Sequence, residues 1–210
     1  ADLRFPVQWV NRPNLDFRGF SGTLAAGILK KGDALLALPS RKTSRVKAIV
    51  SYDGELEEAF PPQAITVTLE DEIDISRGDM LVSPGQQPTL DSRFDAHLVW
   101  MTEAPLLPGR QYLIKHATRT VTGAVARIHH RIDINTLVAH PAGQLALNEI
   151  GLCELALSAP IAFDPYRRVK GTGSFILVDR LTHATVAAGM VLRPIERHLT
   201  WKPVTREERA

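Results

Sequence analysis

The sequence predicts an all-β protein made of two consecutive β domains, each a barrel or a sandwich. Apolar and polar residues alternate with a period of two along much of the chain, and long helical periodicity is almost absent. The alternating runs recur about every 8–12 residues with turn-forming residues between them, which is typical of sandwiches and barrels. An irregular stretch at 83–93, SPGQQPTLDSR, interrupts the series and predicts a domain boundary.

The first half of the chain contains the first series of expected strands. Alternation begins at once, with Leu3, Phe5, Val7 and Trp9 as the apolar members of the first run. We expect strands at 3–9, 34–38, 45–52, 64–69 and 79–82. The β-branched residues of 64–69 favour a strand, and Asp53-Gly54 is the strongest short turn signal in the chain.

The second half contains another series, expected at 94–100, 111–116, 120–135, 149–157, 174–178 and 185–192. The run 120–135 alternates most clearly, with Ile128, His130 and Ile132 expected on one face and Arg127, His129 and Arg131 on the other. The segment 179–183 predicts a hairpin loop between the last two strands. We therefore expect domains at 1–88 and 89–195, followed by a linker at 196–210 toward a further domain.

Composition limits the classes of function. The chain of 210 residues is 44% hydrophobic and 23% charged, which is ordinary for a soluble globular protein. No apolar run approaches the roughly 20 residues that span a membrane, and no signal peptide is visible. The lone Cys153 excludes an internal disulfide and fits the cytoplasm, where we expect the protein. The net charge of +2 does not by itself indicate a nucleic-acid partner.

Because the chain starts in a strand-like run without a Met, we expect a segment of a longer protein.

One glycine-rich stretch, GFSGTLAAGILKKGD at 19–33, has the first half of a phosphate-binding loop. Its Gly22 and Gly27 have the correct spacing, but a phosphate loop needs Lys and then Ser or Thr after the second glycine. Here Gly27 is followed by Ile28 and Leu29. The glycines are better explained by strand and turn geometry or by the close approach of another backbone segment.

The other reactive residue types show no constellation that carries chemistry. His129 and His130 are adjacent, so in a regular strand they point to opposite faces and cannot share a metal. The remaining candidates are His116, His140 and His183, which lack ligand partners at zinc spacing, and Cys153, which fits a core position. We predict no catalytic, cofactor-binding or metal-binding residue in this chain.

Two charged clusters leave alternatives open. The acidic residues of 70–74 either bind a cation or form a solvated loop, and the loop is favoured because no calcium-binding glycine turn follows. Arg167, Arg168 and Lys170 lie beside two glycines and could contact a phosphate or an acidic partner, although a solvated loop again explains them. The residues alone therefore point to a positioning or partner-binding role.

Longer phrases carry a resemblance to a known family. They are VNRPNLDFRGFSGTLAAGILKKGD, LPSRKTSRVKAI and ITVTLEDEIDISRGDMLV in the first half. In the second half they are FDAHLVWMTEAPLLPGRQYLIKHATRTVTGAVARIHHRIDINTL and LNEIGLCELALSAPIAFDPYRRVKGTGSFILVDRLTHATVAAGM. Over about nine tenths of the chain the sequence resembles sulfate adenylyltransferase subunit 1, the GTPase subunit of bacterial ATP sulfurylase, which is related to translation elongation factors.

The resemblance implies two β-barrels like elongation-factor domains II and III, behind a GTPase domain. It also implies a catalytic small subunit as partner, which makes adenylyl sulfate and pyrophosphate from ATP and sulfate, driven by GTP hydrolysis. GTP, ATP and Mg are thus implied for the full-length protein and none for this segment, because the GTP-binding motifs are missing. The tail VTREER at 204–209 resembles the run-in to a fused adenylyl-sulfate kinase domain.

Three hypotheses follow. In the first, this is the middle segment of a sulfate adenylyltransferase large subunit fused to the kinase, inactive alone, without a membrane partner. In the second, it is the RNA-binding barrel pair of a truncated translation-type GTPase; the 6% aromatic content argues against it. In the third, it is a stand-alone enzyme using His129, Asp133 or the acids of 70–74.

Overall fold

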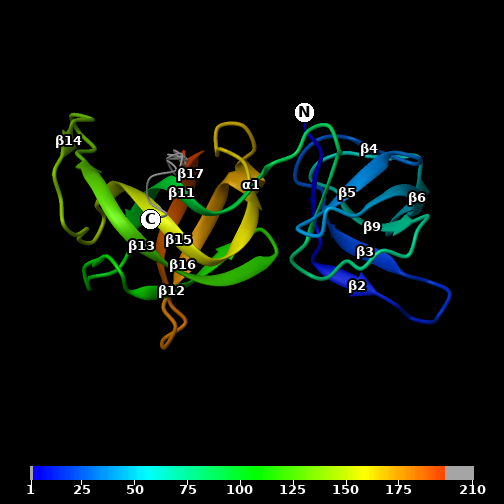
Figure 1. Cartoon of the computed structure of the whole chain (residues 1–210), viewed down its shortest axis with the longest axis horizontal. Coiled ribbons are helices and arrows are strands. Elements are labelled where there is room, and N and C mark those ends of the chain that lie inside the picture. Colours follow the sequence, from blue (N-terminus) through cyan, green and yellow to red (C-terminus); the bar gives the residue numbers. More distant parts are fainter. Residues whose placement is uncertain (1, 197–210) are drawn as a thin grey trace, which may run out of the picture.

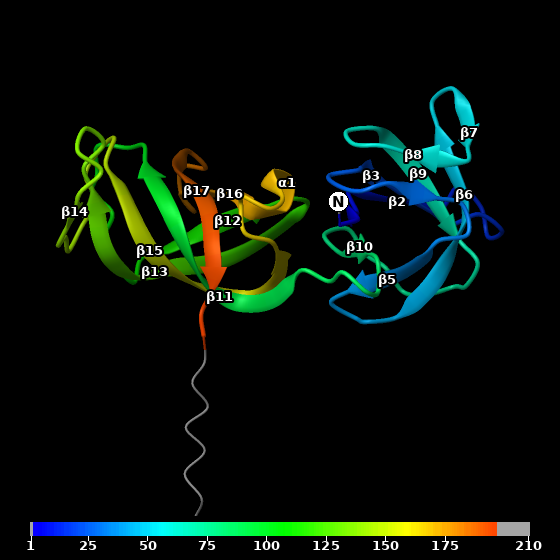
Figure 2. The same cartoon turned by 90° about the horizontal axis from the view of Figure 1, so that it is seen from above.

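The computed structural model describes residues 2–196, and it shows two β-barrels side by side along the long axis of the molecule (Figures 1 and 2). The strands of the first barrel are β1 (Arg4–Pro6), β2 (Trp9–Asn11), β3 (Gly19–Thr23), β4 (Leu29–Lys30), β5 (Ala34–Leu38), β6 (Thr43–Ser51), β7 (Gly54–Leu56), β8 (Glu58–Ala59), β9 (Ala64–Leu69) and β10 (Met80–Val82). The elements of the second are β11 (Thr89–Trp100), β12 (Gln111–His116), β13 (Arg119–Ile132), β14 (Ala139–His140), β15 (Ile150–Phe163), α1 (Lys170–Gly173), β16 (Ser174–Val178) and β17 (Thr185–Pro194). The predicted all-β fold is confirmed, and no helix in the described residues is long and apolar enough to cross a membrane.

The first barrel is one curved sheet with the strand order β1-β10-β5-β6-β9-β3-β2, to which β7 adds at β6. The two ends of this path, β1 and β2, follow one another in the chain, so the sheet curves back on itself. The core holds the inward-facing members of the alternating runs, including Phe5, Phe20, Ile49 and Val67.

The second barrel is closed. Its order is β12-β16-β17-β11-β15-β13-β14, and an additional pairing of β12 with β13 joins the sheet into a cylinder. Its core contains the aromatic cluster of Phe94, Phe163 and Phe175, with the rings of Phe94 and Phe163 4.9 Å apart between centroids. The predicted loop at 179–183 is confirmed, because Asp179 donates its N–H to Ala184 at the base of the β16–β17 hairpin.

Two details of the strand predictions are wrong. The stretch 83–93 is not irregular throughout, since β11 begins at Thr89 and pairs with Phe163 across a register shift between Asp91 and Arg93. Trp9 does not continue the inward face of Leu3, Phe5 and Val7, because β1 ends at Pro6 and β2 starts a new run at Trp9. The indole is therefore 62% exposed. The predicted linker at 196–210 lies outside the described residues except for Glu196.

The two barrels meet along a seam that is partly apolar. Leu36 and Leu38 of β5 and Met80 and Val82 of β10 form a buried cluster, against which Ala162 of β15 packs. Burial of these side chains favours one fixed contact between the barrels.

A buried polar network, made of Arg4, Asp164, Thr172 and His116, completes the seam. The guanidinium of Arg4 is fully buried and donates to both carboxylate oxygens of Asp164, from Nε at 2.7 Å and from Nη2 at 3.0 Å. Thr172 donates its hydroxyl to the same carboxylate at 2.6 Å. Burial alone would raise the pKa of Asp164, but the hydrogen bonds from Arg4 and Thr172 and the charge of Arg4 outweigh it and hold the pKa below its usual value.

His116 of β12 is the titratable member of this network on the second barrel. Its Nε2 lies 2.7 Å from the backbone carbonyl oxygen of Thr172, and because a carbonyl only accepts, Nε2 carries the proton that is donated. Burial lowers the pKa of His116 below its ordinary value, against the raising effects of Thr172 and Asp164. The folded protein therefore holds this imidazole neutral.

This burial predicts a loss of stability on acidification. Unfolded His116 takes up a proton below about pH 6.5, whereas the folded form resists protonation, so the free energy of unfolding should fall as the pH drops from about 6.5 toward the lower folded pKa. His97, whose pKa burial also lowers, adds a change of the same sign. His116→Gln should make the decline between about pH 7.5 and 5.5 shallower in urea unfolding. The control variant is His183→Gln, which makes the same substitution at an exposed histidine outside this network. An unchanged slope in His116→Gln would contradict the assignment.

Candidate functional site

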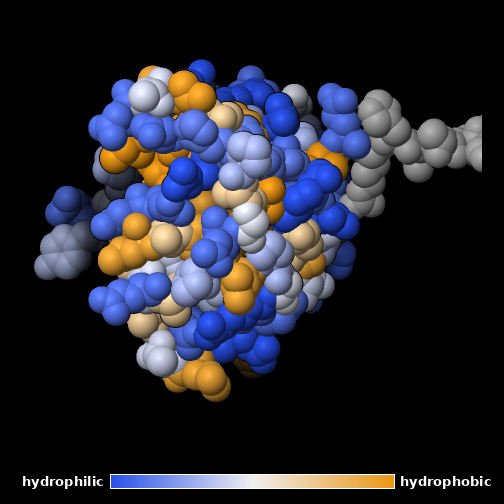
Figure 3. Space-filling model, turned by 90° about the vertical axis from the view of Figure 1, so that its left-hand side faces the viewer, coloured by the Kyte–Doolittle hydropathy of each residue, from blue (hydrophilic) through white to orange (hydrophobic). Residues whose placement is uncertain are grey.

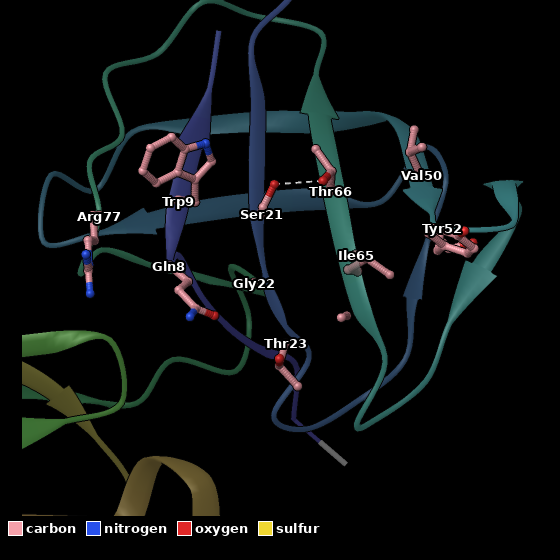
Figure 4. A pocket seen from close by; sticks show the side chains of 12 residues that line it. Gln8, Trp9, Ser21, Gly22, Thr23, Val50, Tyr52, Ile65, Thr66 and Arg77 are labelled. Carbon is pink, nitrogen blue, oxygen red and sulfur yellow. Dashed lines mark hydrogen bonds between the residues drawn. The ribbon is translucent and has the colours of Figure 1, made fainter. Parts of the chain in front are cut away.

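A pocket of about 560 Å³ opens on the first barrel, over strands β2, β3, β9 and β6. Figure 4 shows its lining, with Trp9 and Arg77 on one side and Tyr52 and Val50 on the other. Between them the hydroxyls of Ser21 and Thr66 lie 2.7 Å apart and share a hydrogen bond. The full lining is Gln8, Trp9, Ser21, Gly22, Thr23, Val50, Ser51, Tyr52, Ala64, Ile65, Thr66 and Arg77.

The chemistry of this lining suits binding. Two exposed aromatic side chains, Trp9 and Tyr52, and the guanidinium of Arg77 can contact a planar or an anionic group. The lining holds hydroxyls, amides and apolar atoms but no carboxylate, histidine or cysteine that could transfer a proton at neutral pH. The pocket can therefore hold a ligand or a partner side chain.

Sequence reasoning did not find this pocket, because its lining comes from separate segments of the chain. Tyr52 precedes the Asp53-Gly54 turn, which places it at a hairpin tip, and that turn signal could have indicated an exposed ring. The exposure of Trp9 depends on the break between β1 and β2, which the alternation of 3–9 concealed.

The glycine-rich stretch has the structural role that its sequence predicts. A Cβ added to Gly22 would lie 2.3 Å from the carbonyl oxygen of Pro6, and one added to Gly27 would lie 2.6 Å from the Cα of Leu3. Gly27 also has a φ of +78°, which L-residues rarely adopt. Both glycines admit a neighbouring backbone, as expected, and Lys31 and Asp33 flank a turn at Gly32.

The prediction that His129 and His130 point to opposite faces is wrong. The pairing of β13 with β15 shifts register between Ile128 and His130, which marks a β-bulge. His130 is registered with Leu152, on the side of β15 away from the core, and the Nε2 of His129 lies 2.8 Å from Oδ1 of Asp95 on the outer side of β11. Both imidazoles thus face outward. In residues 2–196, no group of three or more His, Cys, Asp or Glu side chains is arranged to hold a metal ion.

The candidates for a stand-alone enzyme do not converge. His129 lies on the outer face of the second barrel, and Asp133 accepts backbone hydrogen bonds in the turn after β13. The acids of 70–74 belong to the first barrel, where Asp71 bonds the hydroxyl of Ser44 and Asp74 pairs with Arg18. These positions give no shared site for a reacting group.

Two further candidate residues, Arg168 and Cys153, have structural roles. Arg168 of the basic loop forms an ion pair with Asp2, so it helps to hold the start of the chain against the second barrel. Cys153 is buried, and burial raises the pKa of its thiol to about 12. That thiol is protonated at neutral pH and packs as a small apolar side chain, as predicted.

Comparison with known proteins gives a consistent result. Residues 93–192 match the family model described as GTP-eEF1A C-terminal domain-like. The chain is 55% identical to sulfate adenylyltransferase subunit 1 of Alteromonas mediterranea, over 92% of this chain and 41% of that protein. It is 58% identical to the bifunctional enzyme CysN/CysC of Rhodopirellula baltica, over 91% of this chain and 30% of that protein.

Among solved structures, Sup35 complexed with GDP superposes with a TM-score of 0.84 at 21% identity, over 93% of this chain and 48% of that one. At this identity the match concerns the fold alone. The chain spans about two fifths of the length of the subunit 1 relative and less than a third of the bifunctional one.

Proposed function

Because the chain belongs to the family of sulfate adenylyltransferase subunit 1, we propose that it is the non-catalytic two-barrel segment of a GTP-dependent large subunit in sulfate activation. In this role the barrels position a GTPase domain and contact the catalytic small subunit, which forms adenylyl sulfate and pyrophosphate from ATP and sulfate. A kinase domain downstream would fit the name of the bifunctional relative. The observation that carries the proposal is 55–59% identity over about nine tenths of the chain.

The geometry supports a positioning role in a second way. The apolar seam and the buried network of Arg4 and Asp164 hold the barrels in one arrangement. A segment that transmits the position of a GTPase domain to a partner subunit needs such a fixed geometry, because a freely hinged pair would not pass a displacement on.

Isothermal titration of the chain with the catalytic small subunit tests the proposed contact. We expect binding with a dissociation constant on the order of micromolar, which a modest interface supports. No binding by this chain, under conditions in which a full-length large subunit of the family binds, would refute the contact.

We also expect no measurable binding of GTP or ATP to this chain, so micromolar affinity for either nucleotide would contradict the assignment of GTP, ATP and Mg to other domains.

A second candidate function rests on the pocket of the first barrel. Exposed aromatic rings beside a guanidinium can stack against nucleic-acid bases, and Trp9, Tyr52 and Arg77 supply these groups. An RNA-binding barrel pair would shift tRNA in a gel assay, with an affinity that falls as salt rises. Loss of that shift in Trp9→Ala would locate the RNA in the pocket, whereas no shift for the wild type removes this candidate.

A further inference from the structure

The end of the second barrel remote from the first barrel exposes a group of large apolar side chains. We call it the apolar end surface, and its members are Met101, Leu107, Ile134, Leu137, Val138 and Leu147, each between 42% and 79% exposed. They come from the loop between β11 and β12 and from the segment between β13 and β15. Figure 3 views this end of the molecule and shows apolar side chains in orange among blue polar ones.

Hydrogen bonds tie these two segments together. Leu106 and Leu145 form an isolated bridge, in which Leu106 donates to the carbonyl oxygen of Leu145 at 2.8 Å. Trp100 donates to the carbonyl oxygen of Glu149 at 2.9 Å, and Asn148 donates to that of Trp100 at 2.8 Å. The apolar end surface is therefore supported by backbone contacts, so it is a shaped surface rather than a set of independent loops.

The tip of this surface is a structured turn. Oδ1 of Asp133 accepts the N–H groups of Asn135 at 2.8 Å and Thr136 at 3.0 Å, and these bonds lower the pKa of Asp133. Leu137 donates to the carbonyl oxygen of Asp133 at 2.8 Å. Leu137 has a φ of +59° and is 79% exposed. L-residues with a branched side chain rarely adopt this left-handed conformation, so the turn holds the apolar side chain of Leu137 in solvent against the preference of its own backbone.

A hollow of about 200 Å³ lies next to this turn. Ile134 and Leu147 line it together with polar groups, among them the ion-paired Arg131 and Glu149. Exposed apolar side chains with a polar rim and a recess for a partner's side chain are the anatomy of a protein–protein interface.

The position of the surface indicates which kind of partner covers it. The start of the described chain lies at the seam between the barrels, where Asp2 pairs with Arg168 and Arg4 pairs with Asp164. A domain joined ahead of Asp2, as the proposed function requires, would emerge at that seam. The apolar end surface lies at the opposite end of the second barrel (Figure 1), away from the point at which such a domain would emerge.

We propose that the apolar end surface is the docking site of a separate protein chain, which contributes a complementary apolar face and is the catalytic small subunit. The identity of the partner rests on the proposed function, whereas the location rests on the surface itself. Leu137 is the central contact, and the hollow beside Ile134 receives a side chain of the partner.

The test compares two single substitutions at exposed leucines of the full 210-residue chain. Leu137→Asp places a charge in the apolar end surface, and Asp tolerates the left-handed conformation at this position better than Leu does. Leu181→Asp is the control, because Leu181 is 87% exposed but lies in the β16–β17 loop outside the surface. Isothermal titration with the small subunit should show at least about tenfold weaker binding for Leu137→Asp and wild-type affinity for Leu181→Asp.

Each outcome decides a different point. Equal binding by wild type and Leu137→Asp would overturn the location and leave the proposed function standing. No binding by the wild type would overturn both. Light scattering of the chain alone, with a dimer that Leu137→Asp dissolves, would reassign the surface to a second copy. Circular dichroism checks that the variant is folded, and Leu147→Asp provides an independent variant in the same surface.

Discussion

Replacement of Arg4 by alanine should lower the free energy of unfolding by about 3–5 kcal/mol, because it leaves a buried carboxylate without its cation. The guanidinium of Arg4 is fully buried and bonds Asp164 through two donors. It also donates from Nη1 to the carbonyl oxygen of Gln86 at 2.6 Å. One substitution therefore removes partners from both barrels and from the segment that connects them.

Chemical denaturation measures this effect, and a matched control is available. Arg168→Ala also removes an arginine paired with an aspartate, but that guanidinium is 60% exposed, so its loss should cost about 1 kcal/mol or less. If the barrels depend on Arg4 for their contact, Arg4→Ala should also separate the unfolding transition into two steps. A cost for Arg4→Ala that matches the control would show that the buried pair does not hold the seam.

Gly27→Ala should lower stability by about 2–5 kcal/mol, from two additive causes. An L-residue at a φ of +78° costs about 1–2 kcal/mol. The new Cβ would also lie 2.6 Å from the Cα of Leu3, and relief of such crowding by movement of backbone costs about 1–3 kcal/mol.

Gly32→Ala separates the two causes. Gly32 has a similar φ of +85°, yet an added Cβ meets nothing within 4 Å. Gly32→Ala should therefore lower the free energy of unfolding only by the conformational cost of about 1–2 kcal/mol. Thermal unfolding of both variants compares them directly, and equal losses would mean that contact with Leu3 carries no weight.

Many of the strands follow from the local pattern of apolar and polar residues, so their positions could be predicted from the sequence. Strand β9 was expected at 64–69 and lies at Ala64–Leu69, because β-branched residues and alternation agree there. The expected strand 120–135 is also present as β13, Arg119–Ile132. Its two faces were misassigned, since the bulges between Val125 and Arg127 and between Ile128 and His130 depend on the pairing with β15 and leave no mark on the alternation itself.

The seam and the pocket could not be predicted, because they depend on residues distant in sequence. Arg4 lies between the apolar residues Leu3 and Phe5, an alternation that is typical of a strand residue facing solvent. Its burial depends instead on its partner Asp164, which lies 160 positions away in the sequence. Similarly, the pocket joins Trp9, Tyr52 and Arg77 from three segments. Only the exposure of Tyr52 had a local signal, the turn that follows it.

The pairing of β12 with β13 has a consequence for how the chain behaves before and after assembly. Each of β12, β16, β17, β11, β15 and β13 has a hydrogen-bonded neighbour on both sides. An unpaired strand edge is a template for intermolecular sheet extension, which leads to domain swapping and aggregation. A closed cylinder of paired strands has few unpaired edges. The second barrel can therefore expose apolar side chains at its end while strands of other molecules find little free edge to pair with.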